Sequence, residues 1–276
     1  MRVERGEVQH PTKHKHARRP AERHLPPPAA VIKESKNAMQ LKVMSFNTQH
    51  GHSQYSNRID LDSVPRAILQ SDASIVGLNE VRGLGVDPER YAPQTRIYME
   101  KTGLRGYFAK AIFADQCGPY GNAILSEYPI LYAETVLIPD PEPRRFPDHG
   151  YYETRCVLKA RLGVPGGLTV LVTHFGLNPD EAENAVKTVM KLAEPERCIL
   201  MGDFNVTPED PVLAPIRAHF RDTAEGWTEP KFSYPTYGLD RKIDYVFVTP
   251  DITVVSSDIP HIGESDHFPH TAVLEF

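Results

Sequence analysis

The sequence contains few cysteines and no long apolar run. No apolar stretch approaches the roughly 18 residues that a membrane-spanning helix needs, and the polar N-terminus lacks the apolar segment of about 7 residues or more that a signal peptide needs. The three cysteines, Cys117, Cys156 and Cys198, are odd in number and form no CxxC pair. This spacing argues against a zinc site and against a disulfide framework. We therefore expect a cytoplasmic protein with reduced thiols and no transmembrane segment.

Acidic residues outnumber basic ones outside the first 38 residues. The whole chain carries a formal net charge of −5 at pH 7, and residues 1–38 hold nine Lys and Arg against four Glu. The remaining residues therefore carry a net charge of −10. A domain this acidic would displace few counterions from the DNA phosphates, which argues against tight sequence-independent DNA binding. Bound metal ions could reverse the electric field locally.

Residues 1–38 are predicted to be a disordered tail. They mix both charges with four histidines and the run Pro26-Pro27-Pro28, and they show no apolar periodicity. Met39 stands directly before the first strong strand pattern. We therefore expect one folded domain over residues 39–276.

From Leu41 onwards, strand patterns and helix patterns alternate along the chain. Apolar runs with β-branched residues predict strands, and amphipathic runs predict helices. Hairpin-like pairs occur beside helix-linked strands, which favours an α/β (α+β) domain with mixed sheets over a purely parallel sheet. The predicted strands are 41–46, 74–78, 107–112, 122–126, 155–162, 168–173, 198–201, 243–249 and 271–276, and the predicted helices are 62–70, 91–102 and 179–192.

Acid, amide or imidazole side chains stand next to five of the apolar runs. In layered α/β proteins the strand ends are rigid platforms, and functional sites gather on the loops there. One polar strand end carries no information, but five of them suggest convergence on one point. The five are Phe46-Asn47, Leu78-Asn79-Glu80, Thr173-His174, Met201-Gly202-Asp203-Phe204-Asn205 and Ser265-Asp266-His267.

The carboxylates and amides at these ends suit a hard cation and a reacting phosphate group. Glu80 follows a buried run, where a carboxylate needs hydrogen bonds or a metal, and Mg²⁺ prefers one or two carboxylates with water and substrate oxygens. Asp203 could orient and deprotonate a water, while the Asn205 amide donates to developing charge. Asn47 could bind the cation or a phosphate oxygen, or it could form a simple turn.

The imidazoles suit hydrogen-bond donation to a phosphoryl oxygen. A carboxylate can fix the tautomer of a histidine, and we expect Asp266 to do so for His267, directly or through another histidine. His174 could donate to phosphate or could be structural. Asp244, in KIDYVFV, is a candidate support for one of the histidines, or an edge-strand charge.

Taken in order, these strings resemble the endonuclease/exonuclease/phosphatase superfamily, the fold of pancreatic deoxyribonuclease. The resemblance implies a four-layer α/β/β/α sandwich, with two packed mixed sheets and helices outside. It covers Val43 to Phe276 through VMSFNTQHG, IVGLNEV, YGNAILSEYPI, VTHFGLN, ILMGDFNVTPED, KIDYVFV and ESDHFPHTAVLEF.

The same resemblance implies a role for each matching residue. Its metal-binding Glu falls on Glu80, with Asn47 beside the same Mg²⁺, and its phosphate-contacting His falls on His174. One or two Mg²⁺ ions are expected, with Mn²⁺ or Ca²⁺ as alternatives. Asp203 and Asn205 match the water-orienting and transition-state groups, and Asp266 and His267 match the closing pair. All four of these residues could also contact metal. Asp244 matches a further catalytic carboxylate, and Asn122 and Arg155 match substrate contacts.

The chain departs from the DNA-repair members of that superfamily at two positions. Those members often have Asp and Tyr where this chain has Gln49 and His174. The departure favours the deoxyribonuclease, sphingomyelinase and small-phosphoester branches.

The sequence therefore predicts a divalent-metal-dependent hydrolase that attacks a phosphate ester in line with an activated water. The acidic body favours a small phosphomono- or diester, or a phospholipid headgroup, as the substrate. A nuclease acting on DNA or RNA is the alternative, because Arg144-Arg145 and the basic tail could contact phosphates. A non-catalytic binding module is a further alternative, although every core candidate residue is present. The oligomeric state is left open.

Overall fold

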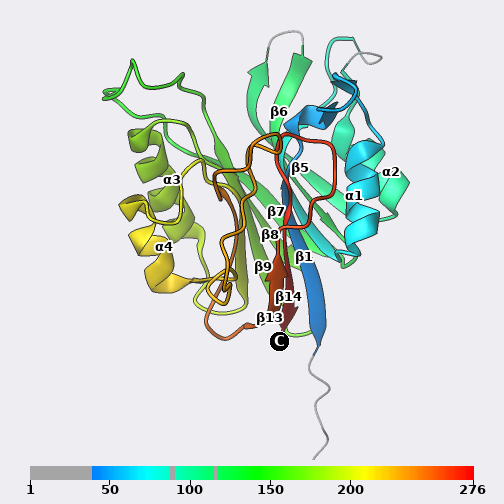
Figure 1. Cartoon of the computed structure of the whole chain (residues 1–276), viewed down its shortest axis with the longest axis vertical. Helices are drawn as coiled ribbons and strands as arrows, with labels where there is room; N and C mark the ends of the chain where they lie inside the picture. The colour runs from blue at the N-terminus through cyan, green and yellow to red at the C-terminus, as the bar shows by residue number, and fades with distance from the viewer. Residues whose placement is uncertain (1–38, 88–90, 115–116) are drawn as a thin grey trace, which may run out of the picture. The chain divides into compact units, whose positions relative to one another are not determined.

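Two six-stranded mixed sheets form the centre of the structure, a computed structural model that describes residues 39–87, 91–114 and 117–276 (Figure 1). The predicted tail, residues 1–38, lies outside the described residues. In spatial order, the first sheet contains β13 (Thr253–Asp258), β14 (His270–Glu275), β1 (Gln40–Asn47), β4 (Ile75–Arg82), β6 (Gly118–Ser126) and β5 (Arg105–Ala114). The second sheet contains β11 (Arg221–Asp222), β12 (Asp244–Val248), β10 (Cys198–Asp203), β9 (Leu168–His174), β8 (Cys156–Leu162) and β7 (Ile130–Leu137).

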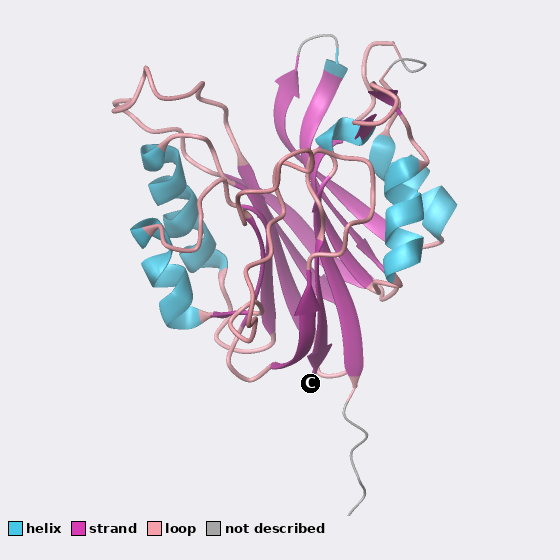
Figure 2. Cartoon of the chain, in the orientation of Figure 1, coloured by secondary structure: helices cyan, strands magenta, loops and turns pink. Residues whose placement is uncertain are grey.

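Helices cover the outer faces of both sheets (Figure 2). Helices α1 (Ser63–Ser71) and α2 (Gln94–Thr102) lie on the first sheet, and α3 (Pro179–Leu192) and α4 (Ala214–His219) lie on the second. The short elements are the hairpin of β2 (His52–Ser53) and β3 (Arg58–Ile59) and the 3-10 turns η1 (Gln49–Gly51) and η3 (Pro211–Leu213). Within the described ranges, every helix is too short or too polar to cross a membrane.

Three apolar cores hold the layers together. The inner faces of the two sheets pack through residues such as Val43, Ile75 and Val172. The outer face of the first sheet packs on α1 and α2, and the outer face of the second packs on α3 and α4. Because the central strands are buried on both faces, their sequences are continuous apolar runs. The predicted four-layer α/β/β/α sandwich is therefore confirmed.

The capping residues of α3 show why the sequence starts a helix there. Asn178 and Glu181 form a capping box, in which each side chain pairs with the backbone N–H of the other residue. Pro179 occupies the first helical position, where its missing N–H costs nothing. The three predicted helices are present, with boundaries that differ by up to three residues.

The sequence patterns did not reveal β7, β13 or α4. Strands β7 and β13 are edge strands whose side chains are mostly half-buried or exposed, so they lack the apolar runs of the central strands. Helix α4 has only six residues, which is too short for a helical period to be visible.

The register of the central strands brings the polar strand ends together. Strand β1 is parallel to β4, with Asn47 opposite Asn79, and β9 is parallel to β10, with His174 opposite Asp203. Strand β12 runs antiparallel to β10 and begins with Asp244 opposite Asp203. Directly opposite residues share a face of the sheet, so His174, Asp203 and Asp244 form one polar row.

Three residues in or beside this polar row have a backbone φ angle in the left-handed region, and this conformation sets the direction of the side chains around them. Glu80 has φ 58°, where the register of β4 shifts between Leu78 and Val81, and Asn205 has φ 53°. Both are non-glycine residues, so this conformation costs on the order of 1 kcal/mol or more each. Gly202 has φ 148°, and a Cβ added there would collide with the Thr173 carbonyl oxygen.

Substituting Gly202 should destabilise the fold strongly. We expect Gly202→Ala to lower the free energy of unfolding by about 3 kcal/mol or more, because both the backbone conformation and the Thr173 contact exclude a side chain. Urea unfolding followed by circular dichroism measures this loss. Gly226→Ala is the matched control, since a Cβ there meets no atom within 4 Å. Equal stability of the two variants would contradict the interpretation.

Candidate active site

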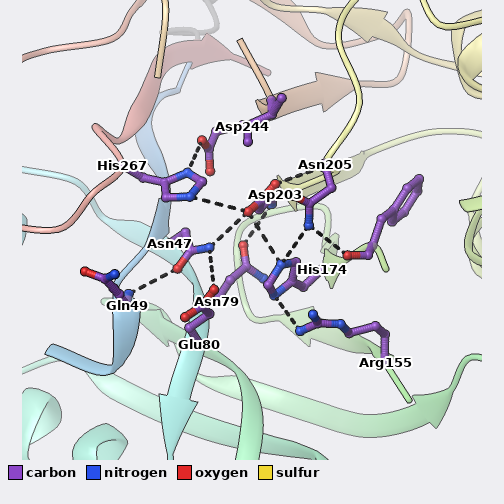
Figure 3. Close-up of polar contacts among 12 residues, drawn as sticks. Asn47, Gln49, Asn79, Glu80, Arg155, His174, Asp203, Asn205, Asp244 and His267 are labelled. Carbon is purple, nitrogen blue, oxygen red and sulfur yellow. Dashed lines mark hydrogen bonds and ion pairs between the residues drawn. The ribbon is translucent and has the colours of Figure 1, made fainter. Parts of the chain in front are cut away.

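The Asp203 carboxylate lies where side chains from both sheets converge (Figure 3). It is 1% exposed, and its Oδ2 accepts a hydrogen bond of 3.0 Å from the Asn47 amide. The same Oδ2 lies 3.5 Å from His174 Nε2 and 3.7 Å from His267 Nε2. Its Oδ1 accepts from the backbone N–H of Asn205 at 2.9 Å. Five polar strand ends that are distant in sequence therefore meet around one carboxylate.

Asn47 links Asp203 to Glu80. Its Nδ2 donates to Glu80 Oε1 at 3.1 Å as well as to Asp203, and its Oδ1 accepts from the Gln49 backbone N–H at 3.1 Å. The other Glu80 oxygen accepts from the Tyr120 hydroxyl at 2.8 Å. The carboxylates of Glu80 and Asp203 thus both accept a hydrogen bond from the NH₂ group of Asn47.

The His267 ring is held by Asp244 and not by its neighbour Asp266. His267 Nδ1 donates to Asp244 Oδ2 at 2.8 Å, and the Tyr234 ring packs against the imidazole at an interplanar angle of 39°, with 4.5 Å between centroids. Asp266 instead accepts from the Ser265 hydroxyl at 3.1 Å. The orienting role expected for Asp266 is corrected to Asp244, because strand register places Asp244 in the polar row while Asp266 lies in a loop.

His174 is enclosed by hydrogen-bond donors. Arg155 Nη1 lies 3.1 Å from its Nδ1, and Asn205 Nδ2 lies 3.1 Å from its Nε2. Arg155 is itself paired with Glu153 at 2.7 Å. A neutral imidazole can accept from only one of the two donors, so the tautomer decides which contact is a true hydrogen bond.

Burial sets the charge of these groups. Burial raises the pKa of Asp203 above its ordinary value, against the opposing effects of His267 and the Asn47 amide. Burial disfavours a charge on His267, but the carboxylates of Asp244 and Asp203 outweigh it and raise the pKa of His267. Burial and the Arg155 guanidinium lower the pKa of His174. The surroundings therefore favour the charged form of His267 and the neutral form of His174.

The oxygen-rich groups around Asp203 fit a hard divalent cation. Glu80 and Asp203 both direct a carboxylate oxygen at the Asn47 amide group, which supplies only a partial positive charge. Among the residues that the structure describes, the buried Oδ1 of Asp244 has no hydrogen-bond partner, and Asp203, Asp244 and His267 each offer an atom within 4.8 Å of the others. Mg²⁺ and Mn²⁺ prefer carboxylate and carbonyl oxygen ligands. Because Asp244 already holds the His267 ring, the Glu80 side suits the cation better.

Comparison with family models assigns the chain to a known family. A profile of the Endonuclease/Exonuclease/phosphatase family matches residues 44–267. The chain belongs to this family. Members of the endonuclease/exonuclease/phosphatase family are metal-dependent hydrolases that act on phosphoesters, and they include phosphatases and nucleases.

Solved structures of family members share the fold. The endonuclease/exonuclease/phosphatase from Beutenbergia cavernae is similar, with a TM-score of 0.72 and 21% identity over 86% of this chain and 72% of its own. The mannosyl-6-phosphatase from Bacteroides thetaiotaomicron has a TM-score of 0.65 and 17% identity over 86% of this chain and 100% of its own. The human Nocturnin catalytic domain has a TM-score of 0.63 and 15% identity, covering 85% and 94%. A search of curated protein sequences finds no match.

A cavity of about 890 Å³ opens above the site of this family member. Its walls include the predicted residues Glu80, Arg155, His174, Asp203, Asn205, Asp266 and His267. Asn47 lies just below, within hydrogen-bond distance of Asp203. The proline-rich loop at 139–150 and the residues after it supply His149 and Tyr151 to one side of the cavity.

Asn122 does not reach this cavity. Its Oδ1 accepts from Asn79 at 2.8 Å and its Nδ2 donates to the Cys156 carbonyl at 3.0 Å, both inside the protein. Asn122 is 2% exposed and does not line the cavity, so its contacts are internal, and its expected role as a substrate contact stays a prediction.

The sequence assigned no role to three residues that organise the site. They are Tyr120, which holds Glu80, Tyr234, which packs against His267, and Asn79, which contacts the Asp203 backbone. Tyr120 and Asn79 stood inside the strings YGNAILSEYPI and IVGLNEV, so their position beside a motif residue was a usable signal. Tyr234 lay outside every such string, and only the structure reveals it.

Removing the Asp244 charge should release the proton of His267. We expect Asp244→Asn to lower the pKa of the His267 imidazole by about one pH unit or more, because a carboxylate 2.8 Å away stabilises the charged ring. Titration of the imidazole by NMR gives this value. In Asp222→Asn, which loses a carboxylate paired with Lys242, His267 should titrate as in the parent protein. An unchanged His267 titration in Asp244→Asn would refute the assignment.

Proposed function

We propose that this protein is a divalent-metal-dependent phosphoesterase that hydrolyses small phosphate mono- or diesters, including phospholipid headgroups, by in-line attack of water. The observation that carries the proposal is the buried Asp203 carboxylate, which is surrounded by His174, His267 and Asn205 at the floor of a cavity. Carboxylate, imidazole and amide groups aimed at one point suit the activation of water and the stabilisation of charged phosphoryl oxygens.

In this mechanism Asp203 is the general base. Its raised pKa makes it a stronger base than an exposed carboxylate, and it accepts the proton of the water that attacks phosphorus. Mg²⁺ would be held by Glu80 and, with its amide turned so that Oδ1 faces the cation, by Asn47, and it would supply charge neutralisation to the phosphoryl oxygens.

Three donors stabilise the phosphoryl group as negative charge develops on it. The charged His267 ring donates through Nε2, and Asp244 keeps that ring protonated and oriented. The Asn205 amide also donates to the phosphoryl oxygens. His174 does so through Nε2, in the tautomer that carries its proton on that atom. Arg155, beside His174 on the cavity wall, adds positive charge where the substrate phosphate binds.

The size and charge of the surroundings favour a small substrate. The cavity, of about 890 Å³, lies within the range of small-molecule sites. The arginines that could contact nucleic acid are engaged within the protein. Arg145 pairs with Glu183 at 2.8 Å, and the Arg144 guanidinium lies 4.7 Å from the centroid of the Tyr152 ring. The similarity to a mannosyl-6-phosphatase is consistent with a small phosphomonoester, although it extends to the fold alone.

Substitution of the proposed base or donor should abolish most activity. We expect Asp203→Ala and His267→Ala each to lower kcat by on the order of 10³-fold or more while circular dichroism shows a folded protein. Asp251→Ala, an exposed carboxylate in the β12–β13 turn, is the control and should keep normal kcat. Turnover within about tenfold of the parent in either site variant would defeat the proposed roles.

Metal removal and a substrate panel test the reaction class. We expect EDTA to stop hydrolysis and added Mg²⁺ or Mn²⁺ to restore it. The panel is p-nitrophenyl phosphate, bis-p-nitrophenyl phosphate, sphingomyelin and supercoiled plasmid. Preferred cleavage of the plasmid, with a steep dependence on salt, would replace the small-substrate proposal with a nuclease. Full activity after metal removal would overturn metal dependence.

A further inference from the structure

A polar bridge crosses the apolar interior directly beneath the site. Asn79 on β4 is 0% exposed and Asn122 on β6 is 2% exposed, and both belong to the first sheet. Around them, the facing surfaces of the two sheets pack through aliphatic side chains such as Val43 and Val172. Buried amides are costly unless every polar atom finds a partner, so the contacts of this pair explain its presence.

Asn79 uses its whole amide group, and two of its three hydrogen bonds cross to the second sheet (Figure 3). Its Nδ2 donates to the Thr173 carbonyl on β9 and to Asn122 Oδ1, both at 2.8 Å. Its Oδ1 accepts from the Asp203 backbone N–H on β10 at 2.9 Å. Asn122 completes the bridge by donating to the Cys156 carbonyl on β8 at 3.0 Å. The first sheet is thus tied to three strands of the second.

The bridge matters because the site takes residues from both sheets. Glu80 and Asn47 come from the first sheet, while His174 and Asp203 come from the second. Aliphatic packing has no directional preference, whereas hydrogen bonds of fixed length and angle select one placement of the sheets.

We propose that Asn79 is a positioning residue that sets the distance between the Glu80 and Asp203 carboxylates. Glu80 follows Asn79 directly and holds a left-handed φ of 58°, so the peptide between them determines where the Glu80 side chain points. On the other side, Asn79 holds the backbone N–H of Asp203 itself. One side chain therefore connects the cation-binding half of the site to the half that contains the base. This inference rests on the proposed phosphoesterase function.

The test compares Asn79→Leu with the matched control Thr249→Val. Leucine has a similar volume but makes none of the three hydrogen bonds of Asn79. Thr249→Val removes a buried hydrogen bond of 3.0 Å to the Cys198 backbone N–H, at the opposite end of the same β10 strand. Both variants should unfold at lower temperature than the parent protein, so stability alone does not separate them.

We expect Asn79→Leu, at a temperature where it is fully folded, to lower kcat by about 10- to 100-fold, because misplacement of supporting groups by ångströms has effects of this size. The KM for bis-p-nitrophenyl phosphate should change little. Thr249→Val should keep the kcat of the parent protein. Normal kcat in Asn79→Leu would show that Asn79 only stabilises the fold, and would overturn the proposal.

Two further measurements do not depend on turnover. Hydrogen–deuterium exchange at the Asp203 amide should accelerate in Asn79→Leu and remain slow in Thr249→Val. The increase in Tm that Mg²⁺ produces should shrink in Asn79→Leu alone. If the parent protein hydrolyses no phosphoester, the proposed function fails, and exchange at the Asp203 amide still tests the contact with Asn79. If Asn79→Leu does not fold, Asn79→Ser, which leaves room for a water, takes its place in all three measurements. Unchanged exchange and an unchanged Mg²⁺ effect in a folded Asn79 variant would reject the positioning role.

Discussion

The site depends on keeping one carboxylate, Asp203, buried between polar groups from two sheets. Removing a charge from water is costly unless hydrogen bonds or opposite charges compensate. Here the compensation comes from the Asn47 amide, the backbone N–H of Asn205 and the charged His267 ring. None of these partners is local in sequence except Asn205, so the carboxylate has its environment only when both sheets are in place.

The direction of the central strands in the sandwich brings these polar groups to the Asp203 carboxylate. In each sheet, a parallel pair of central strands ends at the same edge, and the strand ends carry the polar residues. The apolar cores account for the stability of the layers, and two of the residues with a strained left-handed backbone, Glu80 and Asn205, lie at this edge. Strain of this kind persists where the surrounding structure enforces it, which is consistent with an edge built for chemistry.

Most of the strands and the candidate residues could be predicted from the sequence for two physical reasons, while the four-layer sandwich was implied by the resemblance to the superfamily. Central strands buried on both faces are continuous apolar runs, and a polar residue that interrupts such a run stands out. The edge strands β7 and β13 have neither feature and were missed. The internal hydrogen bonds of Asn122 could not be foreseen, because a buried amide that pairs within the protein and an amide that binds substrate look alike in sequence.

The sequence by itself determined which residue types stand at the strand ends, and therefore the family, the sandwich and the set of candidate residues. Only the tertiary structure decided which of them face each other. Asp244 and not Asp266 holds His267, because antiparallel register places Asp244 opposite Asp203. Likewise Asn79 reaches the Asp203 backbone only because the two sheets pack face to face. Strand register and sheet packing decide which residues become partners. Neither register nor packing can be deduced from the spacing of residues along the chain.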